Sequence, residues 1–273
     1  WQGERLVAAC PMYLKNHSYG EYVFDWAWAN AYSQHGLDYY PKGLVAAPFT
    51  PVPGARLLAQ DESARSALVQ ALLDHATSEN LSSLHLLFLQ PDDADVCKAH
   101  GLMLRHTVQF HWSNQVPTQA ALDTTCDLQP QTFSSFEHFL ASLQQEKRKK
   151  IRQERRKVSD AGVKFRWKRG GDITSAEWDF FYRCYERTYL EHGNAPYLTR
   201  DFFHRMEQAM PQHWLLFIAE FNGRPIACSL IGIDAELGVA YGRYWGALER
   251  VDCLHFEACY YQPLDWCIEH GFR

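Results

Sequence analysis

Apolar residues recur at helical spacing over residues 136–158 and then change to strand spacing. The helical stripe predicts one long helix, which Ala161-Gly162 would end. Apolar and polar residues alternate over Val163–Trp167, which predicts a strand, and Gly170-Gly171 predicts the turn after it. The helical stripe consists of Phe136, Phe139, Leu140, Leu143, Ile151 and Val158.

Two further helices are expected next. Thr174 and Glu177 have the spacing of a capping box, and the apolar positions after them predict a helix that Gly193 would end. A shorter helix is expected from about Thr199 to just before Pro211.

The last part of the chain predicts a hairpin, a strand and a helix. Asn222-Gly223 separates apolar runs over 214–221 and 225–233, which is a strong hairpin signal. A further strand is expected over 239–245. The final helix is expected to start at about His255 and to end at His270-Gly271.

The first half of the chain repeats part of this order. "QGERLVAACPMYL" at its start is similar to "NGRPIACSLIGI" around Gly223, and a strand-like "GLVAAPF" follows. A helix over 61–79 and a strand over 84–89 come next. The order predicts a duplication with domains at 1–130 and 131–273. Each predicted domain lacks elements at its outer end, so we expect the native protein to be longer or its sheet edges to be covered.

Composition limits the possible classes of protein. The 273 residues are 47% hydrophobic and 14% aromatic, which excludes a disordered chain, and the net charge of -5 argues against a general nucleic-acid coat protein. Eight cysteines without a CxxC pair favour reduced thiols and a cytoplasmic location. No apolar run approaches the roughly 20 residues of a membrane-spanning helix, and no signal peptide is visible.

Positive charge is concentrated in "QQEKRKKIRQERRKV", residues 144–158. This segment has eight Lys or Arg and two acidic residues. Such a helix is often only a solvated face. Unrelieved like charge is nevertheless unfavourable unless an anion offsets it. Arg148, Arg152 and Arg155 are spaced to share one face, and guanidinium groups bind phosphate through two hydrogen bonds. We therefore consider these three arginines candidate phosphate ligands.

A second concentration of polar and aromatic residues is "HSYGEYVFDWAW". Its alternation over 22–26 predicts a strand. Either this block forms a substrate pocket, or it is an aromatic core with paired polar groups. Lys42, which follows "YYP", is a further candidate for binding the anionic part of a substrate. The candidate pocket residues in the block are His17, Tyr19, Glu21, Asp25 and Trp26.

The order of elements in the second half is similar to that of GNAT acyltransferases, and two such units in tandem resemble the Fem-type aminoacyltransferases. The chain most resembles the FemAB-like GNAT proteins of bacteria associated with peptidoglycan biosynthesis. The resemblance implies an α/β fold of mixed (α+β) sheets with flanking helices, arranged as two tandem GNAT-like domains. It rests on the blocks "PMYLKNHSYGEYVFDWAWANAY", "YYPKGLVAAPFTPVPGARLL", "QFHW", "KRKKIRQERRKV", "PYLTRDFF" and "YGRYWGALERVDCLHFEACYYQ".

The resemblance implies transfer of an acyl or aminoacyl group from an activated ester or thioester to an amine. GNAT enzymes hold the acyl-CoA pyrophosphate with Arg/Gln-x-x-Gly-x-Gly/Ala. The nearest match here runs from Arg243 through Tyr244 and Gly246 to Leu248, which stands where a small residue is expected. Arg243 is a further candidate phosphate ligand, and Tyr244 is a candidate substrate-pocket residue. Fem-type enzymes share this departure and use aminoacyl-tRNA. An acetyl-CoA-dependent N-acetyltransferase and a catalytically silent binding module are the alternatives.

The same resemblance places an acceptor site near the last helix. Transfer to an amine needs a base for the amine proton and an acid for the leaving group. His255 or Glu257 is the candidate base, and Tyr260 or Tyr261 the candidate acid. Alternatively, His255 and Glu257 only cap the helix and match its dipole at the first turn. We expect a phosphorylated cell-wall precursor as partner, tRNA as one candidate donor, and no tightly bound cofactor. No metal site is expected, because His255 and Cys259 lack a second pair of ligands.

Overall fold

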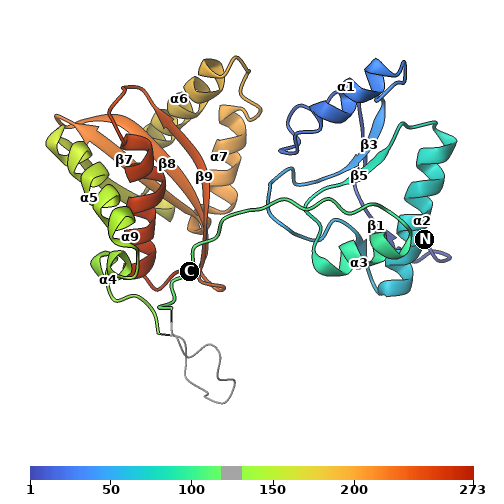
Figure 1. Ribbon diagram of the computed structural model, residues 1–273, viewed down its shortest axis with the longest axis horizontal. Coiled ribbons are helices and arrows are strands. Elements are labelled where there is room, and N and C mark those ends of the chain that lie inside the picture. Colours follow the sequence, from blue (N-terminus) through green and yellow to red (C-terminus); the bar gives the residue numbers. More distant parts are fainter. Residues whose placement is uncertain (118–130) are drawn as a thin grey trace. The chain divides into compact units, whose positions relative to one another are not determined.

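The computed structural model describes residues 1–117 and 131–273, which form two compact units, 1–109 and 110–273 (Figure 1). The predicted domains, 1–130 and 131–273, assign residues 110–117 to the first domain instead. In the structure these residues pack on the second unit, because the Trp112 ring contacts Phe139 and Asn114 donates a hydrogen bond to the Phe272 carbonyl. The end of the predicted first domain, 118–130, lies outside the described residues.

The first unit contains a three-stranded sheet in the order β2-β3-β5. Strand β2 is antiparallel to β3, and β3 is parallel to β5. Strands β1 and β4 form a separate antiparallel pair. The elements are β1 (Ala8–Ala9), β2 (Tyr13–Lys15), α1 (Trp26–Gln34), β3 (Lys42–Val45), β4 (Leu58–Ala59), α2 (Glu62–Ser78), β5 (Leu84–Leu86) and α3 (Pro91–Ala99).

In the first unit the predicted helix over 61–79 and strand over 84–89 are confirmed, and the predicted strand over 22–26 is wrong. Helix α2 occupies the predicted range, with the Asp61 side chain accepting from the Ala64 amide, and β5 lies within the predicted strand. The predicted strand over 22–26 does not form. Tyr22 has a left-handed backbone (φ +58°), and α1 starts at Trp26. The alternation arises because the buried carboxylate of Asp25 stands between exposed aromatic side chains, and not because the segment is a strand with one buried face.

The second unit is built on one antiparallel sheet in the order β6-β7-β8-β9. Its elements are α4 (Phe136–Ala141), α5 (Gln145–Asp160), β6 (Val163–Arg169), α6 (Ser175–Glu191), α7 (Arg200–Ala209), β7 (Trp214–Phe221), β8 (Arg224–Asp234), β9 (Val239–Ala247), α8 (Leu254–Phe256) and α9 (Gln262–Glu269). Short 3₁₀ turns at 170–172 and 211–213 follow β6 and precede β7.

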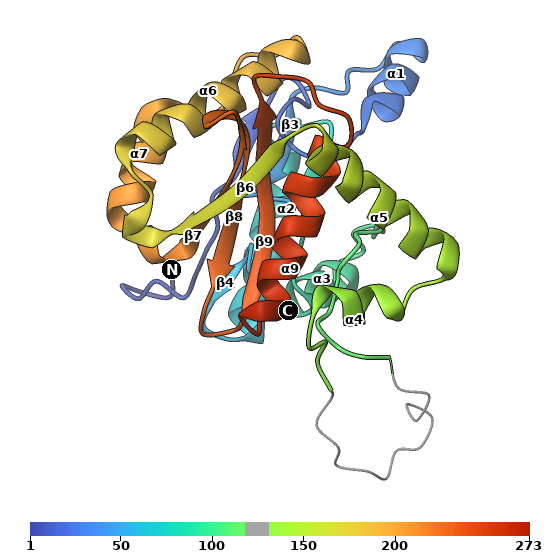
Figure 2. The same ribbon diagram turned by 90° about the vertical axis from the view of Figure 1, so that its left-hand side faces the viewer.

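Figure 2 shows α6 and α7 on one face of this sheet and α5 and α9 on the other. Alternate residues of β7 serve the two faces: Leu216 and Ile218 pack among the aromatic side chains of α6 and α7, whereas Leu215 and Phe217 pack against Trp266 of α9. This two-residue period is the signature of a strand buried on both sides.

The hairpin and capping predictions for the second unit are confirmed. Asn222 and Gly223 both have positive φ (51° and 73°), as the tight turn between β7 and β8 requires. Thr174 and Glu177 form a reciprocal capping box at the start of α6. The mixed α/β class is thus confirmed, while the GNAT-like identity of each unit stays a prediction.

The single helix predicted over 136–158 is wrong, because the chain forms two helices. Residue 144 has an extended backbone (φ -57°, ψ 147°) and caps α5 without a side-chain bond. The two helices bury different surfaces: Phe136 and Leu140 of α4 pack with Tyr261 and Ile268, whereas Val158 at the end of α5 joins a cluster under β7 and β8. One straight helix over 136–158 could not direct the apolar side chains of both segments at these two separate clusters.

The last helix has the predicted extent but is interrupted by a π-turn. Residues 257–261 form i→i+5 hydrogen bonds between α8 and α9. The buried Ser229 hydroxyl of β8 donates to the Ala258 carbonyl (2.5 Å) within this turn. Single π-turns in helices are often found at functional sites.

Gly246 of β9 allows the sheet to approach α6 closely. A Cβ atom at this position would lie 2.1 Å from the Cys184 carbonyl oxygen. Gly246→Ala is therefore expected to lower the free energy of unfolding by about 3 kcal/mol through overpacking. Gly242→Ala is the control on the same strand, because a Cβ there meets no atom within 4 Å. Equal urea-unfolding midpoints for the two variants would contradict this close approach.

Candidate functional site

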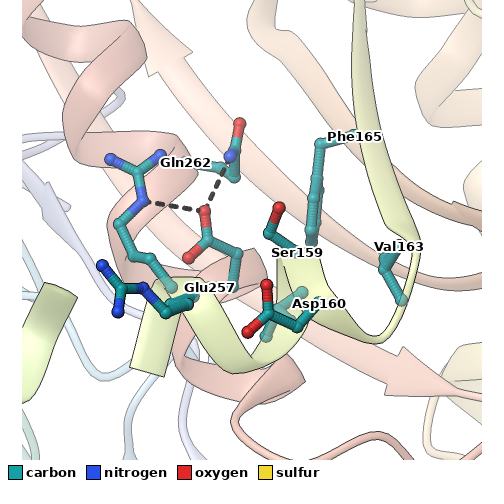
Figure 3. Close-up of a pocket in the computed structure, with 9 residues that line it drawn as sticks. Ser159, Asp160, Val163, Phe165, Glu257 and Gln262 are labelled. Carbon is teal, nitrogen blue, oxygen red and sulfur yellow. Dashed lines mark hydrogen bonds and ion pairs between the residues drawn. The ribbon is translucent and has the colours of Figure 1, made fainter. Parts of the chain in front are cut away.

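A cavity of about 540 Å³ opens on the α5 face of the second unit (Figure 3). It lies between the end of α5, the start of β6 and the π-turn. Its polar walls come mainly from α5 and the last helix, and its apolar wall from β6. The lining residues are Arg155, Arg156, Val158, Ser159, Asp160, Val163, Phe165, Glu257 and Gln262.

Glu257 is the buried carboxylate of this cavity, with a residue exposure of 4%. Its Oε1 accepts from the Arg155 Nε (3.1 Å) and from the Gln262 amide (2.7 Å), as Figure 3 shows. Its Oε2 is also buried but has no hydrogen-bond partner among the described residues. One oxygen is therefore fixed by two donors, and the other is left to accept a proton or a hydrogen bond from a ligand.

Arg155 is fixed on three sides. Besides Glu257, its Nη2 lies 3.4 Å from the Asp265 Oδ2, and its guanidinium carbon lies 4.5 Å from the centre of the Phe136 ring. Because one guanidinium meets two carboxylates, it holds Glu257 in place and offsets the charge that burial would otherwise make costly.

The π-turn brings Glu257 and Gln262 together. In an α-helix with about 3.6 residues per turn, residues five apart point in different directions. The i→i+5 bonds of the π-turn bring positions 257 and 262 one above the other. Sequence periodicity could not reveal Gln262 for this reason.

The other predicted catalytic residues do not line the cavity. The Tyr261 hydroxyl donates to Glu154 of α5, and both residues are buried. Burial, followed by this hydrogen bond, raises the pKa of Tyr261. The structure thus gives Tyr261 a bonding role between two helices, which does not fit the predicted proton donor to a leaving group.

His255 and Tyr260 are exposed and do not line the cavity. The His255 ring contacts the rings of Trp245 (5.3 Å between centroids) and Tyr260 (5.9 Å), and partial burial lowers the pKa of His255. The four predicted catalytic residues therefore divide, with Glu257 alone in the cavity.

The three arginines predicted to bind phosphate also separate. Arg155 lines the cavity, Arg152 pairs with Glu137 on an exposed surface, and the Arg148 guanidinium donates to the Ala141 carbonyl (3.3 Å). Arg156, which follows Arg155, lines the cavity without an acidic partner among the described residues. The three exposed lysines that likewise have no acidic partner there are Lys147, Lys149 and Lys157.

The segment that resembles an acyl-CoA motif has a structural role. The Leu248 amide donates to the Ile226 carbonyl (2.7 Å), and Gly246 packs against α6. Tyr244, predicted in a substrate pocket, contacts the buried rings of Tyr185 and Phe203, and Arg243 lies over the Tyr244 ring (4.5 Å). Since the Leu248 amide is already bonded, it is not available to a pyrophosphate.

In the first unit, Lys42 is fully buried and bonded. Its Nζ lies 2.6 Å from the Asp25 Oδ2, 2.8 Å from the Glu21 Oε2 and 2.9 Å from the Ser18 Oγ. The Tyr39 hydroxyl also donates to Asp25 (2.8 Å). This placement does not fit the predicted contact of Lys42 with a substrate anion, because two carboxylates already surround the ammonium.

Electrostatics in this cluster follow from the close ion pairs. Burial alone would raise the pKa of Asp25, but hydrogen bonds from Lys42, Ser18 and Tyr39 outweigh it and lower that pKa. Burial and the nearby Lys42 charge lower the pKa of His85 to about 4. The Lys42 cluster (Ser18, Glu21, Asp25, Tyr39, Lys42) is thus a buried, hydrogen-bonded core, which fits the second of our two interpretations for Glu21 and Asp25.

The remaining residues of that block form an exposed aromatic edge. The Tyr19 ring lies 5.6 Å from His17 and 5.0 Å from Trp26, and Tyr19 and Trp26 are 55% and 40% exposed. These rings are exposed, whereas the Lys42 side chain is fully buried.

The described ranges also bear on disulfide, metal and membrane chemistry. Each cysteine in 1–117 and 131–273 is a free thiol. Over the same residues, His, Cys, Asp and Glu side chains form no group of three or more that could hold a metal ion. Neither is any helix there long and apolar enough to cross a membrane.

Comparison with known families gives a match over residues 1–273 to the FemAB-like model, described as peptidoglycan biosynthesis/recognition. The chain belongs to the FemAB-like family. This confirms the family predicted from the sequence blocks. Comparison with curated proteins gives no match.

Two solved structures are similar in fold at 10% sequence identity. One is the C-terminal domain of a putative lysylphosphatidylglycerol synthetase from Agrobacterium fabrum (TM-score 0.48, covering 85% of this chain and 61% of that one). The other is L-PGS from Bacillus licheniformis (TM-score 0.49, 86% and 61%). The FemAB-like chain spans about three fifths of each.

Replacing Arg155 tests the Glu257 arrangement. Arg155→Gln is expected to cost about 2–3 kcal/mol, because it leaves a buried carboxylate without its cation. Arg152→Gln on the same helix is the control and is expected to change stability by less than about 0.5 kcal/mol. The double variant Arg155→Gln with Glu257→Gln should recover most of the loss in urea unfolding. Failure to recover would show that Arg155 acts through something other than Glu257.

Replacing Lys42 tests the cluster in the first unit. Lys42→Met should destabilise this unit by about 3 kcal/mol at neutral pH, measured by hydrogen exchange of β3 amides, with exposed Lys98→Met as the control. The lowered pKa of Asp25 gives stability that is present above its unfolded value of about 3.9 and lost on acidification below it. The difference in stability of the first unit between wild type and Lys42→Met should therefore shrink below about pH 4. A difference that does not change with pH would contradict this pairing.

Proposed function

We propose that the chain is an acyltransferase that forms an amide on an amine of a cell-wall precursor, using an activated acyl or aminoacyl ester or thioester. The observation that carries this proposal is the Glu257 carboxylate, which is buried in the cavity with one oxygen fixed and the other without a partner among the described residues. The family description, peptidoglycan biosynthesis/recognition, supports the class of acceptor.

In the proposed reaction the acceptor amine attacks the carbonyl carbon of the donor, and its proton passes to Glu257. The tetrahedral intermediate then collapses, the bond from carbon to the ester oxygen or thioester sulfur breaks, and the leaving group takes up the proton that Glu257 had accepted. Glu257 is preferred to His255 as the base because it lines the cavity, whereas His255 lies among surface rings.

Arg155 and Arg156 have different roles in this proposal. Arg155 holds Glu257, because its guanidinium is already bonded to Glu257 and Asp265. Arg156 binds the anionic part of the precursor, since it lines the same cavity without an acidic partner among the described residues. A guanidinium can grip a phosphate through two hydrogen bonds and so orient the amine toward Glu257.

An aminoacyl ester such as aminoacyl-tRNA is favoured over acetyl-CoA as the donor. The observation in support is the bonded Leu248 amide at the place where GNAT enzymes hold pyrophosphate. The proposal places the reaction in the cytoplasm, where such donors and reduced thiols occur. A binding module that holds an anionic ligand without turnover is the alternative of another class.

The test supplies labelled aminoacyl-tRNA, and separately acetyl-CoA, together with amine-bearing peptidoglycan precursors, and measures the amide product. We expect product with aminoacyl-tRNA and a loss of at least about 100-fold in kcat for Glu257→Gln, since general base catalysis contributes that much. Glu236→Gln, an exposed acid in a loop of the same unit, is the control.

The outcomes separate the alternatives. Product from acetyl-CoA alone would favour the N-acetyltransferase. Saturable binding of the precursor without product from either donor would favour the binding module. Full activity of folded Glu257→Gln would exclude Glu257 as the base, whichever donor is used.

A further inference from the structure

The second unit has another cavity, on the opposite face of the sheet. It has a volume of about 610 Å³ and lies between the start of α6 and the turn of the β7–β8 hairpin. Adjacent residues of β6 serve the two cavities: Phe165 lines the first and Arg166 the second. Since successive side chains of a strand point to opposite faces, the sheet separates the two cavities. The second cavity is not used in the proposed transfer reaction.

The floor of this cavity is apolar. Phe180 and Ile218 are buried, and Pro225 and Leu248 complete the apolar wall. The volume is within the range of small-molecule sites, which typically combine an apolar lining with a few polar groups. An apolar chain placed here would be removed from water on several sides.

The rim carries three arginines and two glutamates, and they differ in how fully they are paired. Arg166 is bonded to both Glu177 and Glu220. Arg224 pairs with Glu249 (2.7 Å), but these side chains are 68% and 38% exposed, so the pair is weak. Arg183 lies over the Phe180 ring (5.7 Å) and has no acidic partner among the described residues.

The charged residues that line this cavity favour an anion with a single negative charge. Arg183 is available to bind a ligand. Arg224 can replace its exposed partner Glu249 with a ligand at low cost, so the two guanidinium groups can bind one planar anion together. Glu177 and Glu249 line the same cavity and would repel a dianion such as a phosphate monoester. A carboxylate carries one negative charge and matches the guanidinium geometry.

We propose that this second cavity binds an organic monocarboxylate with an aliphatic chain. Arg183 and Arg224 hold the carboxylate, and the chain lies over Phe180, Ile218 and Leu248. No covalent step is involved. The inference stands independently of the transferase proposal, because it rests on a different cavity on the other face of the sheet.

The experiment titrates decanoate into the full chain by calorimetry and compares it with decanol, which has the same chain without charge. We expect saturable decanoate binding and at least tenfold weaker binding of decanol, as expected for losing charged hydrogen bonds. Arg183→Gln should weaken decanoate binding by about tenfold. Arg205→Gln, an exposed arginine on α7 paired with Asp201, is the charge-matched control and should leave it unchanged.

Ala176→Trp provides a second test that does not depend on charge. Ala176 is exposed and lines the cavity, so a bulky side chain there should block the ligand without changing the thermal unfolding midpoint. Absence of saturable decanoate binding at millimolar concentration would overturn the proposal. Equal affinity for decanol, unchanged binding by both folded variants, or loss of binding in Arg156→Gln of the first cavity would each overturn it as well.

Discussion

A carboxylate buried inside the second unit constrains how the surrounding elements are built. Glu257 is almost completely buried, and burial of an unpaired charge is strongly unfavourable. Its cation comes from α5, more than a hundred residues earlier in the sequence, and its amide donor from the far side of the π-turn. The hydrogen bonds to Glu257 therefore depend both on the position of α5 against the last helix and on the π-turn within that helix.

The first unit meets the same constraint in a different way. Asp25 and Glu21 converge on one ammonium, so two carboxylates share a single lysine. In the second unit, Glu257 and Asp265 converge on one guanidinium. In both clusters a basic residue joins segments distant in sequence, which supports a unique arrangement of those segments more than it adds to stability. The clusters differ in access: the lysine is sealed, whereas the arginine borders a cavity.

Sequence patterns predicted the elements of the second unit well because most of them depend on local rules. The capping box at Thr174, the Asn222-Gly223 turn and the alternation of β6 all follow from nearest neighbours. The break before Gln145 and the π-turn were missed because both result from packing against distant segments. Of the site, Glu257 and Arg155 were found by residue type. Arg156 and Gln262 were not singled out, since their roles depend on three-dimensional winding.

The predictions for the first unit show the limit of reading chemistry from composition. Lys42 was a candidate for binding a substrate anion, and Glu21 and Asp25 were candidates either for a substrate pocket or for a paired core. The structure pairs all three with one another. A sequence gives the charges but not which of them meet, and a cation enclosed by two anions looks the same in sequence as one awaiting a ligand.

Strand β6 has a consequence for how this protein can vary. Because Phe165 and Arg166 line different cavities on opposite faces, inserting or deleting one residue at the Gly162 turn would shift the strand by one position and exchange the two linings together. Length changes at that turn would thus damage two sites in a single step. The loop between β8 and β9 lines neither cavity and leaves room for such changes. Among homologous chains, gaps should accumulate in the loop between β8 and β9 and be absent from the Gly162 turn.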